Sequence, residues 1–86
     1  MTLHRLTQGL VDEFIEQCKH KLDSTPHSLE EITIAIVTEM EAETEVDSDR
    51  TISKDGVSMS REWTPEGTYA LTLNYKDLVV VSIAGL

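Results

Sequence analysis

The spacing of hydrophobic residues changes once along this sequence, near residue 50, and this change limits the folds open to the chain. Before it, apolar residues recur every three or four positions, the period of an amphipathic helix. After it, apolar and polar residues alternate, the period of a half-buried strand. The helices therefore precede the strands along the chain. The order predicts an α+β fold.

Two helices are expected before residue 50. The first covers about residues 3–22, where one apolar stripe repeats at helical spacing: Leu3, Leu6, Leu10, Phe14, Cys18 and Leu22. The second covers about residues 28–44 and begins at a capping box, in which the Ser28 hydroxyl accepts a hydrogen bond from the Glu31 amide. Residues 32–37 also have the alternating β-branched pattern of a strand. We favour the helix because one apolar stripe continues through Leu29, Ile32, Ile36 and Met40.

An antiparallel meander of three or four strands is expected after residue 50. The short loop after the first helix predicts that the two helices pack antiparallel, and we expect both on one face of the sheet. Residues 53–56 predict a type I turn in which Gly56 takes the positive φ of a bulged hairpin. Pro65 suits the first corner of a turn at residues 64–67. A tight connection at residues 76–77 leads into the last strand.

The chain has 86 residues, with 7 Lys plus Arg against 16 Asp plus Glu and a net charge of −9. This length predicts one domain, residues 1–86, with one small core. The acidic balance argues against direct binding to nucleic acid or to an anionic membrane, because those ligands are held mainly by Lys and Arg. A basic protein is the expected partner.

The expected compartment is the cytoplasm. A single cysteine, Cys18, cannot form an internal disulfide, and a secreted chain of this size usually needs several. The first residues include acidic side chains where a signal peptide needs an apolar stretch. The apolar runs at residues 32–37 and 78–86 are too short to span a bilayer.

Residues 28–49 contain eight acidic residues and no Lys or Arg. Six of them alternate along the chain and form what we term the acidic segment: Glu39, Glu41, Glu43, Glu45, Asp47 and Asp49. The sequence offers this segment no counter-charge before Arg50, and we interpret it as the partner-binding site. A simpler interpretation is that the segment is a solvated helix end and loop. A third interpretation is that it binds a divalent cation.

Other motifs do not indicate catalysis or a cofactor. Residues 47–51 match a phosphoryl-transfer DxDxT pattern but do not follow a buried strand, and as a calcium loop the same stretch lacks its glycine and bidentate Glu. The possible soft ligands are too few for structural zinc: Cys18, His20 and His27. Cys18 lies on the apolar stripe and is expected in the core. No carboxylate pair stands out for acid–base chemistry, so we expect a non-enzymatic protein without metal or cofactor.

Two features of the strands also bear on function. Arg61 has the inward parity of its strand, so it lies either at the rim of the sheet or paired with an acid such as Glu39 or Glu43. The aromatic residues Trp63, Tyr69 and Tyr75 are expected in the core, and the alternative is that some form a contact surface.

The last strand has apolar side chains on both faces, unlike the others. Leu78 and Val80 point one way and Val79, Val81 and Ile83 the other, so a sheet covered on one face would expose some of them. We therefore expect a two-fold homodimer formed through these five residues.

The expected function is a small acidic protein-binding module, an inhibitor or regulator that engages a basic surface. This chain is analogous in size and charge to phage and mobile-element inhibitors that imitate the charge of nucleic acid. Two alternatives are a small enzyme or ligand-binding subunit whose site forms between protomers, and a structural homo-oligomer.

Overall fold

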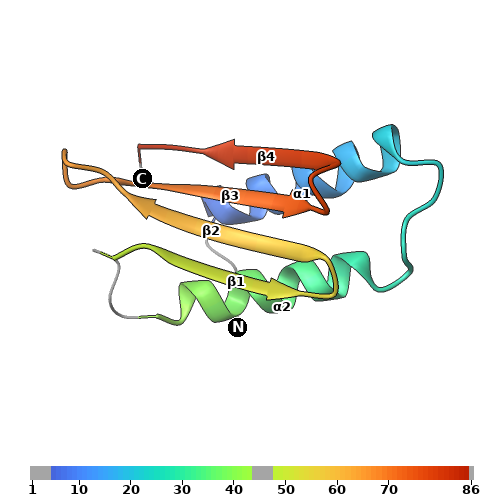
Figure 1. The fold of residues 1–86 in the computed structure, drawn as a ribbon, viewed down its shortest axis with the longest axis horizontal. Coiled ribbons are helices and arrows are strands. Elements are labelled where there is room, and N and C mark those ends of the chain that lie inside the picture. Colours follow the sequence, from blue (N-terminus) through green and yellow to red (C-terminus); the bar gives the residue numbers. More distant parts are fainter. Residues whose placement is uncertain (1–4, 44–47, 86) are drawn as a thin grey trace.

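The computed structural model describes residues 5–43 and 48–85 of the chain, which form two helices and four strands (Figure 1). In chain order they are α1 (Arg5–Lys21), α2 (Leu29–Glu41), β1 (Arg50–Lys54), β2 (Val57–Trp63), β3 (Tyr69–Tyr75) and β4 (Val79–Ile83). The four strands form one antiparallel sheet in the order β1-β2-β3-β4. The predicted α+β fold is confirmed.

The two helices form a layer on one face of the sheet (Figure 1). α1 packs on β3 and β4, and α2 packs on β1 and β2. The chain runs along α1 and returns along α2, so the helices are antiparallel, as predicted (Figure 1). The end of α2, the start of β1 and the β2–β3 turn therefore lie at the same end of the molecule.

α1 confirms the predicted apolar stripe at Leu10, Phe14 and Cys18, whereas Leu6 is exposed and Leu3 lies outside the described residues. Its inward residues are buried: Leu10, Val11, Phe14, Ile15 and Cys18. The last turn carries Lys19, His20 and Lys21, whose positive or donor groups suit the negative end of a helix. The helix ends one residue before the predicted position, although the Leu22 amide still donates to the Cys18 carbonyl at 3.1 Å.

α2 includes residues 32–37, so the choice of a helix over a strand for this segment is confirmed. Three residues of the stripe that favoured a helix, Leu29, Ile36 and Met40, are buried, and Ile32 is partly buried against the core. Thr33 and Val37 complete the buried side. Thr33, which is fully buried, donates its hydroxyl to the Leu29 carbonyl at 2.7 Å and so leaves no unpaired polar group. The helix ends at Glu41, and the predicted end at residue 44 was too late.

Ser28 precedes α2, but the predicted capping hydrogen bond is wrong: its side chain makes no such bond. The cause is its backbone conformation, with φ −87° and ψ 1°, whereas a capping serine has the extended conformation that aims the hydroxyl at the first free amides. The chain enters the helix through a tight turn in which the Leu29 amide donates to the Pro26 carbonyl at 3.1 Å.

The first hairpin turn is tighter than the predicted one. Lys54 lies opposite Val57, so only Asp55 and Gly56 connect the strands. Both have positive φ, +51° and +87°, as in the two-residue turns whose twist matches that of the strands. The positive φ of Gly56 is confirmed, but the type I turn with a bulge is wrong.

The second turn agrees with the prediction. The Gly67 amide donates to the Thr64 carbonyl at 3.1 Å, which places Pro65 at the first corner. Gly67 has φ +83°, and the Thr64 amide then donates to the Thr68 carbonyl at 2.8 Å. This pairing fixes where β3 starts.

The third turn places two residues other than glycine in the left-handed region: Lys76 at φ +49° and Asp77 at φ +61°. Asn74 offsets part of this strain. Its side-chain oxygen accepts from the Asp77 amide at 3.0 Å, and its side-chain nitrogen donates to the Asp77 carboxylate at 3.1 Å. Side chains that bond to nearby backbone in this way stabilise tight turns.

The core lies between the sheet and the helices. The helix-facing residues of the central strands are buried, namely Val57, Met59, Arg61, Leu71, Leu73 and Tyr75. The opposite face of the sheet is uncovered within the described residues and carries mainly hydroxyl and amide side chains, among them Ser58, Ser60, Thr72, Asn74 and Ser82. The two faces thus differ as alternation predicts.

Candidate functional site

Glu43, which follows α2, joins two arginines that arrive from different strands. One carboxylate oxygen lies 2.8 Å from Nε of Arg50, in β1, and the other lies 3.2 Å from Nη1 of Arg61, in β2. Arg50 and Arg61 are opposite each other in the strand register, which is why a single carboxylate reaches both. As the sequence indicated, the first counter-charge of the acidic segment is Arg50, and both cations that pair with Glu43 lie outside the segment.

Arg61 is held from several directions. Its side chain is only 2% exposed, its Nε donates to the Ser48 carbonyl at 3.2 Å, and its Nη1 lies 3.6 Å from the Met40 sulfur. The predicted pairing of Arg61 with an acid is confirmed, with Glu43 as the partner. Because a buried guanidinium needs such partners, Glu43 serves the fold and is not freely available to a ligand.

The three further described members of the acidic segment differ in their surroundings. Glu39 is exposed on α2 and makes no ion pair among the described residues. Asp49 is exposed, and its carboxylate accepts the Trp63 amide hydrogen at 2.9 Å. Glu41 is half-buried. Glu45 and Asp47 lie outside the described residues.

The hydrogen bond from Trp63 places an aromatic pair beside Asp49. The rings of Trp63 and Tyr69 stack with 6.1 Å between their centres and 14° between their planes. Both residues are half-buried, so part of the pair is open to solvent. Tyr75 is buried in the core and Tyr69 packs against it, whereas Trp63 is not part of the core cluster. The prediction of a core position is confirmed for Tyr75 and, in part, for Tyr69, and the contact surface stays a prediction.

Sequence spacing missed two carboxylates at this end of the molecule. Glu62 precedes Trp63, and Glu66 lies in the β2–β3 turn; both are exposed. They are distant from the acidic segment in sequence, and only the strand order brings them to the same end as α2 (Figure 1). We call this region the acidic end and define it by Glu39, Glu41, Glu43, Asp49, Glu62 and Glu66.

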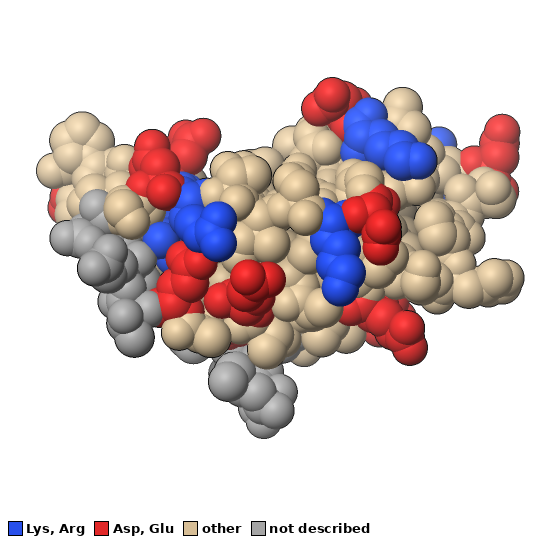
Figure 2. All heavy atoms as spheres, turned by 60° about the horizontal axis from the view of Figure 1, so that its bottom comes forward, with Lys and Arg blue, Asp and Glu red and all other residues tan. Residues whose placement is uncertain are grey.

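Figure 2 shows how charge is distributed on one side of the molecule. Acidic side chains occur in separate groups with Lys and Arg between some of them, so the surface in this view is not uniformly negative. Net charge alone therefore does not locate a binding surface. The surface has to be located from the positions of the exposed carboxylates that form no ion pair.

The predicted self-association residues separate onto two faces of β4. Val79 is buried, and Val81 and Ile83 are partly buried against the core. Leu78 and Val80 are 60% and 54% exposed. β4 lies at the border of the sheet, with β3 on one side. Only Leu78 and Val80 of this set therefore offer large exposed side chains.

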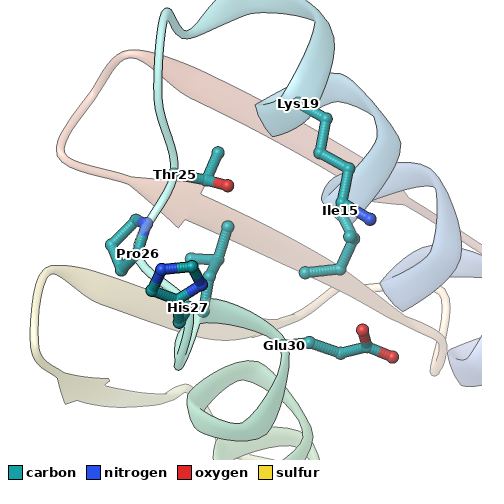
Figure 3. Close-up of a pocket in the computed structure, with 7 residues that line it drawn as sticks. Ile15, Lys19, Thr25, Pro26, His27 and Glu30 are labelled. Atoms are coloured by element: carbon teal, nitrogen blue, oxygen red, sulfur yellow. The ribbon is translucent and has the colours of Figure 1, made fainter.

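A shallow pocket lies between the two helices at the opposite end from the β2–β3 turn (Figure 3). Lys19 of α1 and Glu30 of α2 border it, and Pro26 and His27 of the connecting loop line one side. Its polar groups come from flexible or exposed side chains, and nothing in its lining is arranged as a nucleophile with a base. We do not place the site there.

The described residues contain no metal site and no reactive thiol. Among residues 5–43 and 48–85, no group of three or more His, Cys, Asp or Glu side chains is arranged to hold a metal ion. Cys18 is buried in the core, and burial raises the pKa of its thiol above the ordinary value of 9.0, so it is a poor nucleophile at neutral pH. Within the described chain, neither helix combines the length and apolar character needed to cross a membrane.

Comparisons with protein-family models, curated proteins and solved structures give no significant match to this chain. The function is therefore inferred from the geometry and charge described above.

Proposed function

We propose that this chain is a non-catalytic protein-binding module whose acidic end engages a surface rich in Lys and Arg on a partner protein, as an inhibitor or regulator does. Proteins that bind nucleic acids carry surfaces of this kind, and they are the partner class we propose. The chemistry is charge complementarity, which speeds association and selects the partner.

The observation that supports the proposal most directly is the use of both nearby arginines by Glu43. Within the described residues, no ion pair engages the exposed carboxylates of the acidic end: Glu39, Asp49, Glu62 and Glu66. Glu43 thus uses both nearby cations, and these four carboxylates stay exposed at the same end of the molecule without an ion pair among the described residues. Lys and Arg side chains of a partner can form the ion pairs that these carboxylates do not form within the described chain.

The stacked pair of Trp63 and Tyr69 gives this end a second means of binding. Arginine side chains stack on aromatic rings while their N–H groups reach carboxylates. Asp49 and Glu62 lie next to Trp63 along the fold and the sequence. Tryptophan and tyrosine also dominate the energetics of many interfaces. A partner arginine near Trp63 would make both kinds of contact.

The test uses oligo-arginine as the probe and Trp63 as the reporter, since Trp63 is the only tryptophan of the chain. One variant combines Glu39→Gln, Glu62→Gln and Glu66→Gln. The matched control combines Glu16→Gln, Glu30→Gln and Glu31→Gln, which removes the same charge from exposed helix positions away from this end. Glu43 and Asp49 are kept because each makes a structural hydrogen bond or ion pair.

We expect the first variant to weaken binding about tenfold or more and the control less than about threefold, with affinity falling as salt rises. An equal loss in both variants would show that binding follows net charge and that the acidic end is not a site.

A further inference from the structure

The two borders of the sheet differ in how they are protected. A border strand exposes unpaired backbone N–H and C=O groups, and proteins commonly prevent unwanted pairing there with charged residues. β1 begins with Arg50 and ends with Lys54. β4 has the sequence VVVSI, and residues 78–85 contain no charged side chain. β4 therefore lacks the protection that β1 has.

Of the three large hydrophobic side chains that the described chain exposes, two lie in or next to β4, and the third lies in α1, which packs on β3 and β4. Among the described residues they are Leu6, Leu78 and Val80, at 54%, 60% and 54% exposed. Val80 belongs to β4 and Leu78 directly precedes it. Single exposed hydrophobic residues are common and do not by themselves indicate an interface. The position of these three residues in the fold is therefore what matters for an interface.

Leu6 lies on the flank of α1 that faces this border. Ile15, nine residues further along α1, lines the groove between α1 and α2 together with Glu30. Nine residues are two and a half helical turns at about 3.6 residues per turn, so Leu6 and Ile15 point to opposite sides of the helix. Because α1 packs on β3 and β4, the side away from α2 is the side of the open border.

We propose that β4 pairs antiparallel with β4 of a second copy of this chain and joins the two sheets into one. If the two-fold axis passes through Val81, Val79 lies opposite Ile83 and continues the core-facing row, while Val80 lies opposite Ser82 on the outer face. The backbone groups that β4 leaves open are satisfied by an identical strand in this arrangement.

The uncharged border strand limits the electrostatic cost of pairing with a second copy. Two chains of net charge −9 repel each other, and the repulsion is smallest where they meet through uncharged residues. A stable dimer usually buries about 1,200–2,000 Å² in total, more than one five-residue strand pair provides. The α1 helices of the two copies would lie side by side above the joined strands, and their flanks with Leu6 would add to the buried area.

The test is sedimentation equilibrium of the whole chain at micromolar concentrations. We expect a mass about twice 9.6 kDa for the parent chain and a shift to the monomer mass for Val80→Lys, which adds a charge to an exposed border position. Ser53→Lys is the control, because it adds the same charge to an exposed position on the same face of β1. It should leave the dimer intact. Ser82→Lys, also at an exposed position of β4, provides a second disruptive variant.

Circular dichroism confirms that each variant keeps its helices, and hydrogen exchange reports the pairing directly. Amide protection in β4 should fall in Val80→Lys and not in Ser53→Lys. A parent chain that remains a monomer would overturn the proposal. So would a dimer that survives both β4 variants, or a mass larger than that of a dimer.

Discussion

Arg61 is the charged residue that the described core encloses, and its counter-ion Glu43 is nearer to the surface. The exposed fractions of the two side chains are 2% and 24%. Removing one partner of such a pair is costly mainly when the charge that remains is the more buried one. The two residues should therefore respond unequally to substitution, since loss of Glu43 leaves a buried charge with less compensation, whereas loss of Arg61 leaves a carboxylate that still contacts Arg50.

We expect Glu43→Gln to lower the free energy of unfolding by about 2 kcal/mol, below the usual cost of breaking a fully buried pair because Glu43 is partly solvated. Glu39→Gln, an exposed position on the preceding helix, should change it by less than about 0.5 kcal/mol. Urea unfolding of both variants measures the difference. Equal effects would mean that Glu43 contributes only as a surface charge.

At the scale of the elements, backbone conformation sets the effect of replacing a glycine. Gly56 has φ +87°, and an added Cβ would lie 2.8 Å from Cε of Lys76. Gly9 lies within α1, and an added Cβ there meets nothing within 4 Å. The same substitution should therefore have opposite signs at the two positions.

We expect Gly56→Ala to destabilise the chain by about 1–2 kcal/mol, the cost of a left-handed residue with a side chain. Gly9→Ala should stabilise it by about 0.5–1 kcal/mol, because alanine favours the helix and restricts the unfolded chain. Thermal or urea unfolding of the two variants provides the comparison. A stabilised Gly56→Ala protein would contradict the assigned turn geometry.

The elements themselves could be predicted from sequence because periodicity is local. The stripe through Leu29 and Met40 specified α2, and Gly56 and Pro65 marked turns correctly. The Ser28 hydrogen bond could not be predicted, because it depends on how the chain enters the helix from Pro26. Nor could the type of the first turn, which follows from the pairing register of β1 with β2.

At the scale of the whole molecule, the acidic end depends on topology. Glu62 and Glu66 join Glu39 and Asp49 only because the β2–β3 turn returns to the end of α2 (Figure 1). Charge counting along the sequence could identify residues 28–49 but not these two carboxylates. It also could not show that Glu43 is committed to Arg50 and Arg61, since that requires the strand register.

The chain has many more carboxylates than Lys and Arg cations, and Glu43 forms ion pairs with two of those cations. This excess predicts how the free energy of unfolding responds to salt. The molecule is 39 Å in its longest dimension, and the screening length falls from about 30 Å at 0.01 M to about 8 Å at 0.15 M. At low salt the excess carboxylates repel one another across most of the molecule, whereas at higher salt only neighbouring carboxylates do. We therefore expect the free energy of unfolding to rise over this range. The rise should be smaller when Glu39, Glu62 and Glu66 are replaced by Gln.

Urea titrations at two protein concentrations measure this effect and separate it from self-association, which depends on concentration. If the free energy of unfolding instead falls with added salt, the attraction between Glu43 and its two arginines outweighs the repulsion between carboxylates.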